Sequence, residues 1–394
     1  MKRLFVLGVA LLAAGSVIPL SAQDYREHAL RIIRSAPLVD GHNDLPDAIR
    51  ERGGLDSVDI AQPQPRLHTD LARMHAGGLT AQFWAAYVPV QTMDGQPGPK
   101  AYALEQIDLI HRLCRKYGSF AMALTVADIE RNFKQGFTSC LIGIEGGHAI
   151  EDSLGALKTF YDLGVRYMTL THNRTLSWAD AAVGPARSDG LSPFGEAVVH
   201  EMNRLGMLVD LSHVSDATMS DVIRVSRAPV IFSHSSARAL TNHVRNVPDS
   251  ILRLMRTNGG IVMVNFNPGF VSEAVRQQEA ARDSIRNAML AAGIDSATVR
   301  DTVRAVNSRL HGASLAQVAD HIEHIAREAG LDHVGLGSDF DGITATPRFL
   351  EDVSKFPDLV MELLRRGWGK ADLMKLLGGN TLRVMRRAEA IARR

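Results

Sequence analysis

The chain has 394 residues, of which 45% are hydrophobic and 22% are charged, as in ordinary soluble globular proteins. Its formal net charge is +1, so it has no global field that would attract nucleic acid or an anionic membrane, and we expect no nucleic-acid partner. The 15 histidines are the only compositional indication of metal chemistry.

The first 22 residues have the features of a secretory signal peptide. A positively charged start at residues 2–3 precedes an apolar run over 4–20, and the small residue Ala22 offers a cleavage site. An uncleaved membrane anchor is the alternative interpretation, although the run is at the lower limit of length for a span. We expect cleavage near Gln23, and hence a secreted or periplasmic protein without a stable membrane anchor.

After this leader the chain repeats one unit, in which a short apolar run rich in β-branched residues is followed by a polar loop and an amphipathic stretch. The apolar runs cover 37–42, 79–88, 140–147, 166–173, 207–213, 229–235, 260–266 and 333–340. Helical spacing is seen over 193–205, 215–226, 248–257, 315–329 and 354–366. Strands that are buried on both faces and alternate with helices indicate a parallel sheet. Eight of them favour a closed (β/α)8 TIM barrel, an α/β fold in one domain over 23–394, with the extra run at 120–125 as a short accessory strand.

One polar, Ala- and Arg-rich segment, at about 271–313, interrupts this rhythm between the seventh and eighth strands. Its composition predicts helices. It is either a surface hairpin or a lid, because the loops that leave the C-terminal ends of barrel strands surround the active site.

The two cysteines lie in different patterns. Cys114 belongs to a helical stretch and Cys140 begins a buried strand. An exported protein could pair them, but two separate buried thiols are the prediction that these patterns favour.

Six of the eight predicted strands end in a histidine or a carboxylate. These strand ends carry His42 with Asp44, Glu145, His172, His213, His234 and Asp339. Barrel topology places all such ends on one face, around one axis. So many titratable groups in a semi-buried cup would be costly without a bound cation, and the sequence therefore predicts a metal centre.

Imidazole and carboxylate ligands without thiolate favour zinc, followed by manganese, cobalt or iron. His42 and Asp44 lie two residues apart and would point the same way on a regular strand, while His213 and His234 on adjacent strands could hold a second ion. Glu145 could bridge the two ions with its two oxygens, with a shared hydroxide between them. This arrangement predicts hydrolysis, and the sequence has neither a dinucleotide fingerprint nor a G-x-S-x-G elbow.

Motifs in chain order carry a family resemblance. They read VDGHNDLP, LIGIEGGHAI, LTHN, VDLSHVS, IFSHSSARAL, RNVPD, VNF and GSDFDG, with LEDVSKFPDLVMELLRRGW and GGNTLRVM after them. Together they resemble the membrane (renal) dipeptidase family of zinc metallopeptidases, from about Tyr25 to the C-terminus, with this chain as a bacterial secreted member. The resemblance implies a metallo-dependent hydrolase barrel with two Zn2+ per chain, a homodimer, and dipeptide substrates of L,L and also L,D configuration.

Carried over residue by residue, the resemblance implies that His42 and Asp44 bind one zinc ion and that His213 and His234 bind the other. Glu145 would bridge the two ions and take part in catalysis.

The resemblance also implies three residues that act on the substrate. His172 would contact the substrate and polarise its developing oxyanion. Arg245 would bind the terminal carboxylate, and Asp339 would contact the substrate and handle the proton of the bridging water.

Two functions other than a dipeptidase also fit parts of this pattern. Another barrel amidohydrolase, such as a deacetylase, lactonase or β-lactam hydrolase, usually begins with His-x-His and often uses a carboxylated lysine as its bridge. Here the first strand gives His-x-Asp, and no lysine ends a predicted strand. A non-catalytic periplasmic metal-binding protein would not require His172, Arg245 and Asp339.

Other histidines receive different interpretations. We expect His321 and His324 on a solvated helix face. His148 follows Glu145 closely and is expected to support the metal site from behind.

Overall fold

Eight parallel strands close into a barrel. They are β1 (Val39–Asn43), β2 (Ala81–Tyr87), β4 (Thr138–Glu145), β5 (Val165–Thr169), β6 (Leu208–Asp210), β7 (Ile231–Phe232), β8 (Ile261–Val264) and β9 (Val334–Leu336). Neighbours pair in the order β2-β1-β9-β8-β7-β6-β5-β4, and parallel pairing of β2 with β4 closes the ring. The predicted (β/α)8 barrel is therefore confirmed. The run at 120–125 contains β3 (Phe120–Met122), which pairs only with the first residues of β4, as expected of an accessory strand.

The structure is a computed structural model that describes residues 22–307 and 312–392. The predicted signal peptide, apart from its last residue, lies outside the described residues. Within the described ranges, no helix has the length and apolar character that crossing a membrane requires.

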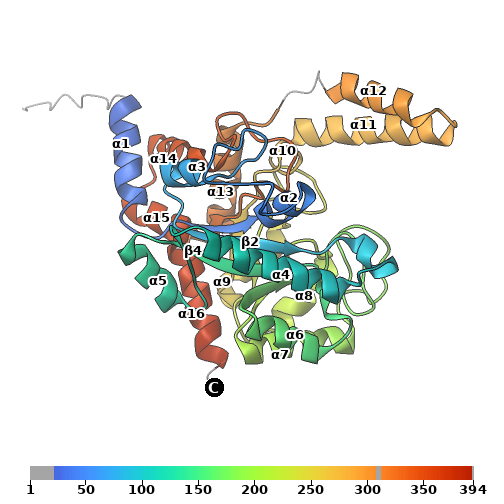
Figure 1. Cartoon of the computed structure of the whole chain (residues 1–394), viewed down its shortest axis with the longest axis horizontal. Helices are drawn as coiled ribbons and strands as arrows, with labels where there is room; N and C mark the ends of the chain where they lie inside the picture. The colour runs from blue at the N-terminus through green and yellow to red at the C-terminus, as the bar shows by residue number, and fades with distance from the viewer. Residues whose placement is uncertain (1–21, 308–311, 393–394) are drawn as a thin grey trace, which may run out of the picture.

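Helices surround the barrel (Figure 1). They are α1 (Ala22–Ile33), α2 (Leu45–Glu51), α3 (Leu71–Gly77), α4 (Pro99–Lys116), α5 (Val126–Gln135), α6 (Leu154–Asp162), α7 (Pro193–Leu205), α8 (Asp216–Val225), α9 (Asp249–Asn258), α10 (Pro268–Val271), α13 (Leu315–Ala329), α14 (Phe356–Arg365), α15 (Lys370–Met374) and α16 (Asn380–Ala392). The five predicted helices agree with α7, α8, α9, α13 and α14 to within two residues at each end.

The bounds of α7 show why the prediction was accurate there. Ser192 caps the helix by accepting a hydrogen bond from the Gly195 amide, and Pro193 occupies the first turn, where its missing N–H costs nothing. Gly206 ends the helix in the left-handed conformation, with a φ of 81°.

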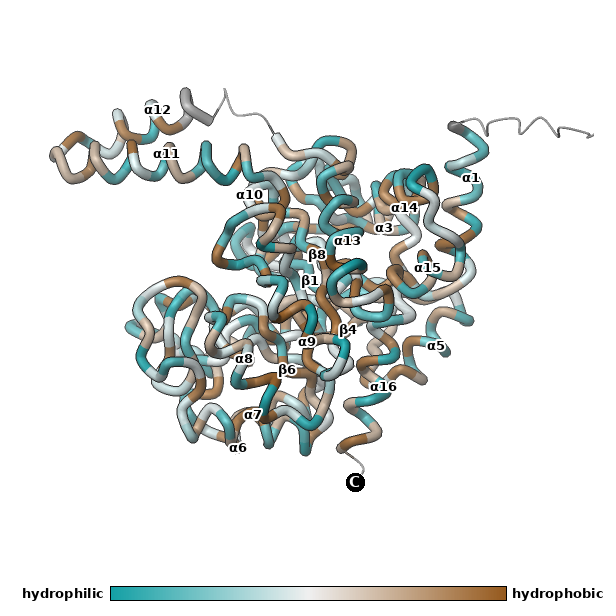
Figure 2. The backbone as a smooth tube through the Cα atoms, turned by 180° about the vertical axis from the view of Figure 1, so that it is seen from behind, coloured by the Kyte–Doolittle hydropathy of each residue, from teal (hydrophilic) through white to brown (hydrophobic). Residues whose placement is uncertain are grey.

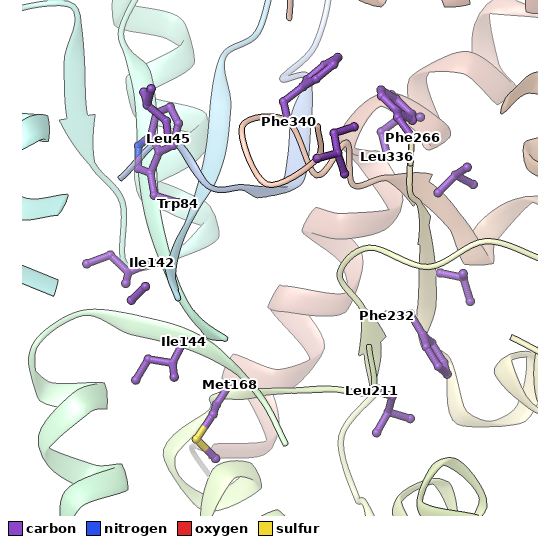
Figure 3. Packing of buried hydrophobic residues seen from close by; sticks show 14 of the residues in the cluster. Leu45, Trp84, Ile142, Ile144, Met168, Leu211, Phe232, Phe266, Leu336 and Phe340 are labelled. Carbon is purple, nitrogen blue, oxygen red and sulfur yellow. The ribbon is translucent and has the colours of Figure 1, made fainter. Parts of the chain in front are cut away.

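Alternate residues of β4 face two different layers. Ile142 and Ile144 belong to the cluster between the strands and the helices (Figure 3), whereas Leu141 packs with Tyr167 in the second cluster, inside the barrel. Because successive side chains of a strand point to opposite faces, Glu145 lies on the same face as Leu141. The strand thus carries its last carboxylate into the barrel.

The same alternation corrects the prediction for the cysteines, which form a disulfide instead of two separate thiols. Cys140 points from β4 toward the helices, as Ile142 does, and Cys114 lies on the buried face of α4. Their Cα atoms are 6.4 Å apart, which is within reach of a disulfide.

Two helices occupy the predicted insertion. α11 (Glu273–Ala291) and α12 (Ser296–Asn307) form a hairpin that projects from the barrel (Figure 1), and hydrophilic and hydrophobic residues alternate along both (Figure 2). Val275 and Val299 are buried, while Ile285 and Leu290 are exposed. The helical prediction is confirmed for the described part of the segment.

The prediction that His321 and His324 lie on a solvated face is wrong, because both are buried, at 1% and 6% exposure. α13 packs against α9 on this side, so the histidines meet protein rather than water. Nδ1 of His321 accepts a hydrogen bond from the Ala237 amide at 3.0 Å, and His324 Nε2 lies 2.8 Å from an Asp249 carboxylate oxygen.

Candidate metal centre

The C-terminal ends of the strands open into a cavity of about 980 Å³. Seven of the eight predicted site residues line it, namely Asp44, Glu145, His172, His213, His234, Arg245 and Asp339. The eighth, His42, is fully buried and lies next to them. No described residue of α11 or α12 lines this cavity, so the hairpin does not cover the site in this conformation.

Five of these residues lie just beyond their strands rather than on them. Asp44, His172, His213, His234 and Asp339 follow the last residues of β1, β5, β6, β7 and β9. His213 and Asp339 also have positive φ angles, of 70° and 65°. Such a conformation is unfavourable for residues other than glycine and persists where the surroundings enforce it, often at functional sites.

Glu145 occupies the centre of the cluster. Its Oε1 lies 3.0 Å from Nε2 of His213 and 3.4 Å from Nε2 of His234. Its Oε2 lies 3.6 Å from Nε2 of His42, which in turn is 3.2 Å from Asp44 Oδ2. The two carboxylate oxygens therefore face two different pairs of side chains.

The orientation of His42 is fixed from inside the barrel. Its Nδ1–H donates to the hydroxyl of Tyr167 at 2.8 Å, and that hydroxyl donates to the carbonyl oxygen of Gly41 at 3.2 Å. In the neutral ring this chain places the proton on Nδ1 and leaves the lone pair on Nε2, which has no hydrogen-bond partner among the described residues. Gly143 provides the space, since a Cβ there would lie 2.0 Å from a ring carbon of Tyr167.

The other two histidines are held in the same way. Nδ1 of His213 is 3.1 Å from the side-chain oxygen of Asn173, and Nδ1 of His234 is 2.8 Å from the hydroxyl of Ser233, which donates to Asp210. Burial holds the pKa of both histidines well below its usual value, so both are neutral. Their Nε2 atoms are 3.0 Å apart. Two acceptors at such a short distance repel each other unless a cation lies between or beside them.

Three overlapping groups of side chains could hold metal ions. In each group the ligand atoms lie within 4.8 Å of one another. The groups are Glu145 with His213 and His234, His42 with Asp44 and Glu145, and His42 with His234 and Asp339. Nitrogen and oxygen donors without a thiolate, with unprotonated Nε2 atoms pointing inward, fit zinc.

The buried carboxylates also call for positive charge. Burial raises the pKa of Asp44 and Asp339. Burial alone would raise the pKa of Glu145 as well, but the histidines around it, His42 foremost, lower it well below its usual value. Three carboxylates gathered out of water are costly unless a cation compensates them, as a metal centre would.

His172 stands at the edge of this cluster. Its side chain is 12% exposed, and its Nε2 is 3.9 Å from Glu145 Oε1. The ring lies edge-on against Tyr87, with centroids 5.0 Å apart, and its Nδ1 has no hydrogen-bond partner among the described residues. Burial lowers its pKa. His172 thus presents a neutral imidazole to the cavity.

Arg245 carries a buried charge that no described carboxylate pairs with. It is 4% exposed and makes no ion pair within the described part of the chain; its guanidinium makes a long hydrogen bond, from Nη1 to the Ser235 hydroxyl at 3.5 Å. Its guanidinium carbon lies 5.5 Å from the centre of the Phe270 ring. Burial lowers its pKa to about 10. A guanidinium exposed only to the cavity is suited to receive a carboxylate.

Sequence reasoning did not find the residues that hold the candidate ligands. Tyr167, Asn173, Ser233 and Asp210 were not singled out, because nothing local to them shows which histidine they contact. His148 is buried, and its ring packs against Gly146, where a Cβ would lie 2.4 Å from a ring carbon.

Solved structures share this fold. A probable dipeptidase from Pseudomonas aeruginosa superposes with a TM-score of 0.82, at 22% identity, over 94% of this chain and all of that one. A metallo peptidase from Rhodobacter sphaeroides, liganded with a phosphinate mimic of the dipeptide L-Ala-D-Ala, is 28% identical, with a TM-score of 0.71 over 90% of this chain and 99% of that one.

Sequence comparison is more specific. Dipeptidase 3 of Rattus norvegicus is 41% identical over 373 residues, which are 93% of this chain and 68% of the rat protein. Dipeptidase 3 of Mus musculus is also 41% identical, over 93% of this chain and 67% of the mouse protein. Residues 26–394 match the family model of membrane dipeptidase. The chain therefore belongs to the membrane dipeptidase family, peptidase family M19, whose members are metallopeptidases.

Proposed function

We propose that this protein hydrolyses dipeptides with two zinc ions bound at the barrel mouth. The observation that carries the proposal is the position of Glu145, whose two oxygens face His42 with Asp44 on one side and His213 with His234 on the other. These five side chains would hold the metal, with Glu145 shared. Zinc supplies Lewis acidity, which lowers the pKa of water and polarises a carbonyl oxygen.

Three further residues would act on the substrate. Arg245 would bind the free carboxylate at the C-terminus, and this requirement would restrict the enzyme to substrates whose carboxylate lies beside the scissile bond. His172 would donate a hydrogen bond to the oxyanion that develops on the scissile carbonyl. Asp339, whose Oδ2 accepts a hydrogen bond from Asn265 at 2.9 Å, would take the proton of the attacking water and pass it to the leaving amine.

We extend the proposal to dipeptides with a D-residue at the C-terminal position. The support is the Rhodobacter sphaeroides metallo peptidase, which is 28% identical and carries a mimic of L-Ala-D-Ala. The proposed role of Arg245 supports it too, because Arg245 would bind the C-terminal carboxylate, which L- and D-residues both have.

Purified protein reconstituted with zinc should be tested on a panel of L,L- and L,D-dipeptides, with tripeptides and dipeptide amides as controls. We expect hydrolysis of the dipeptides, loss of activity on chelation, and little turnover of the controls. Equal turnover of dipeptides and amides would contradict a dipeptidase and favour a general amidase.

We also propose that residues 1–22 are a cleaved signal peptide, that 23–394 form one exported domain in the periplasm or outside the cell, and that the enzyme is a homodimer. N-terminal sequencing of protein from the exporting cell should find a start near Gln23. An intact Met1 in the membrane fraction would contradict cleavage.

A further inference from the structure

One face of α2 carries three carboxylates into the reaction cavity. Asp44 caps the helix, and Asp47 and Glu51 follow it by three and seven residues, so all three share one side of the helix. All three line the cavity, and α2 follows the C-terminal end of β1. A helix rises 1.5 Å per residue, so Asp47 lies about 4.5 Å and Glu51 about 10 Å from Asp44 along the axis.

The two outer carboxylates have no counter-ion among the described residues. Neither Asp47 nor Glu51 makes an ion pair with any residue that the structure describes. The nearby cation, Arg50, is committed to Glu105 at 2.5 Å and stacks over the ring of Tyr102. Burial, and then the charge of Glu51, raises the pKa of Asp47 to about 6. Like charges at this spacing destabilise a helix, so the pair is maintained at a cost.

A buried amide next to Asp47 provides an independent sign of a missing ligand. Gln106 is 0% exposed, and its Nε2 donates to Asp47 Oδ1 at 2.8 Å. The amide oxygen Oε1 of Gln106 has no hydrogen-bond partner among the described residues. The remaining oxygen of Asp47, Oδ2, also receives no hydrogen bond from them. Gln106 Oε1 is buried and Asp47 is half-buried at the cavity, and buried acceptors are normally satisfied, so this side of the cavity is short of donors.

Asp47 and Glu51 lie well away from Arg245 around the mouth of the barrel. α2 follows β1, and Arg245 follows β7; β9 and β8 lie between these strands in the ring. A dipeptide whose carboxylate contacts Arg245 would cross the metal centre with its N-terminal residue directed toward α2. Tyr87, the register partner of Glu145, lines the cavity beside this path.

Two other cations also line the cavity, at its rim. Arg52 and Arg66 are both exposed, and Arg52 donates to the carbonyl oxygen of Ala48 at 2.8 Å. If they governed recognition, an acidic side chain would be preferred. Glu51 is as exposed as these arginines, but Asp47 is half-buried and its neighbour Gln106 is fully buried, and partial burial makes the electrostatic effect of Asp47 stronger than that of solvated arginines.

We infer that Asp47 and Glu51 form a subsite for a cationic side chain on the N-terminal residue of the substrate, so that dipeptides beginning with lysine or arginine are preferred. The inference rests on the proposed dipeptidase function. An ammonium or guanidinium group has donors and no acceptor, so it complements the carboxylate oxygens of Asp47 and Glu51. A long side chain would reach along α2, and its charge would replace the counter-ion that Asp47 and Glu51 lack.

The test compares kcat/KM for L-Lys-L-Ala, L-norleucyl-L-Ala and L-Glu-L-Ala in the zinc-loaded enzyme. Norleucine has the carbon chain of lysine without the amine. We expect the wild type to favour the lysyl over the norleucyl substrate about 10- to 100-fold, as a charge-assisted hydrogen bond does. Asp47→Asn should remove most of this ratio. Glu51→Gln, at an exposed position that tolerates the change, should lower it about threefold, and Glu27→Gln on α1 should leave it unchanged.

The ratio separates selectivity from damage to the metal centre, since such damage lowers turnover of all substrates alike. A ratio near one in the wild type, or a ratio unaffected by both Asp47→Asn and Glu51→Gln, would overturn the subsite. Preference for the glutamyl substrate would assign recognition to Arg52 and Arg66 instead. If none of the three dipeptides is hydrolysed, the proposed dipeptidase function itself fails. If Asp47→Asn does not fold, Glu51→Gln alone decides.

Discussion

Replacement of Arg245 by methionine separates substrate recognition from stability. The guanidinium is buried, lines the cavity, and makes no ion pair with a described residue. Methionine has a similar length and no charge. The variant should lose affinity for the substrate carboxylate and, in the absence of substrate, should be more stable than the wild type.

The structure gives the size of both effects. Burial lowers the pKa of Arg245 from 12.5 to about 10 even though Asp339, Glu145 and Asp210 act to raise it, which corresponds to roughly 3 kcal/mol against the charged form. Replacing buried ionic groups by well-packed apolar side chains of similar volume is often neutral or stabilises proteins by about 1–4 kcal/mol. A bidentate guanidinium–carboxylate contact contributes about 2–4 kcal/mol, so kcat/KM for dipeptides should fall about 30- to 1000-fold.

Two measurements on Arg245→Met check this reasoning. kcat/KM should fall strongly for a dipeptide and far less for the same dipeptide with an amidated C-terminus, which has no carboxylate to lose. The free energy of unfolding should rise by about 1–3 kcal/mol in urea denaturation. Arg31→Met on the exposed side of α1 is the control and should change neither quantity. Equal losses on both substrates, with lower stability, would show that Arg245 is structural.

Three other predictions follow from particular contacts. Glu145→Gln should lower the zinc content measured by mass spectrometry and abolish turnover, because the shared ligand loses its charge; two tightly bound zinc ions with normal activity would contradict the bridge. Replacing Cys114 and Cys140 together by alanine should lower the free energy of unfolding by about 3 kcal/mol, as expected for a disulfide with a sequence separation of 26, and an unchanged urea midpoint would exclude this contribution. Burial lowers the pKa of His321 to about 4, so the unfolded chain binds a proton that the folded chain does not between pH 6.5 and 4. Stability should therefore fall by up to roughly 3 kcal/mol as the pH decreases through this window, and His321→Gln should reduce that slope; parallel stability curves for the two proteins would refute the assignment.

The barrel and the candidate cluster were predictable because both depend on a repeated local pattern. Each strand is a short apolar run, and its end is marked by a change to His or a carboxylate, as at Glu145 and His213. Parallel strands must place their C-terminal ends on one face, so the convergence of these side chains follows from topology without any contact being known. The helix bounds followed from caps such as Ser192 and Gly206.

The failures have a common cause, which is that a helix face cannot be assigned to a neighbour from its own sequence. His321 and His324 fit a polar stripe as well as a buried one, and only the packing of α9 against α13 decides. Cys114 and Cys140 each read as buried, but their pairing depends on which face of α4 covers β4. The same limit hid Asp47, because its exposure to the cavity depends on how α2 leaves the barrel.

The orientation of His42 depends on a contact between distant residues that no local pattern of the sequence reveals. Gly143 and Tyr167 are register partners on β4 and β5. The absence of a side chain at Gly143 lets the Tyr167 ring cross the barrel to Nδ1 of His42, which is 125 residues away in sequence. A glycine usually weakens a strand. Here Gly143 allows the imidazole of His42 to be held in the tautomer that a metal requires. Glu145, two residues beyond Gly143 on the same face, then meets an already oriented His42, so one strand supplies both the candidate bridge and the space for its support.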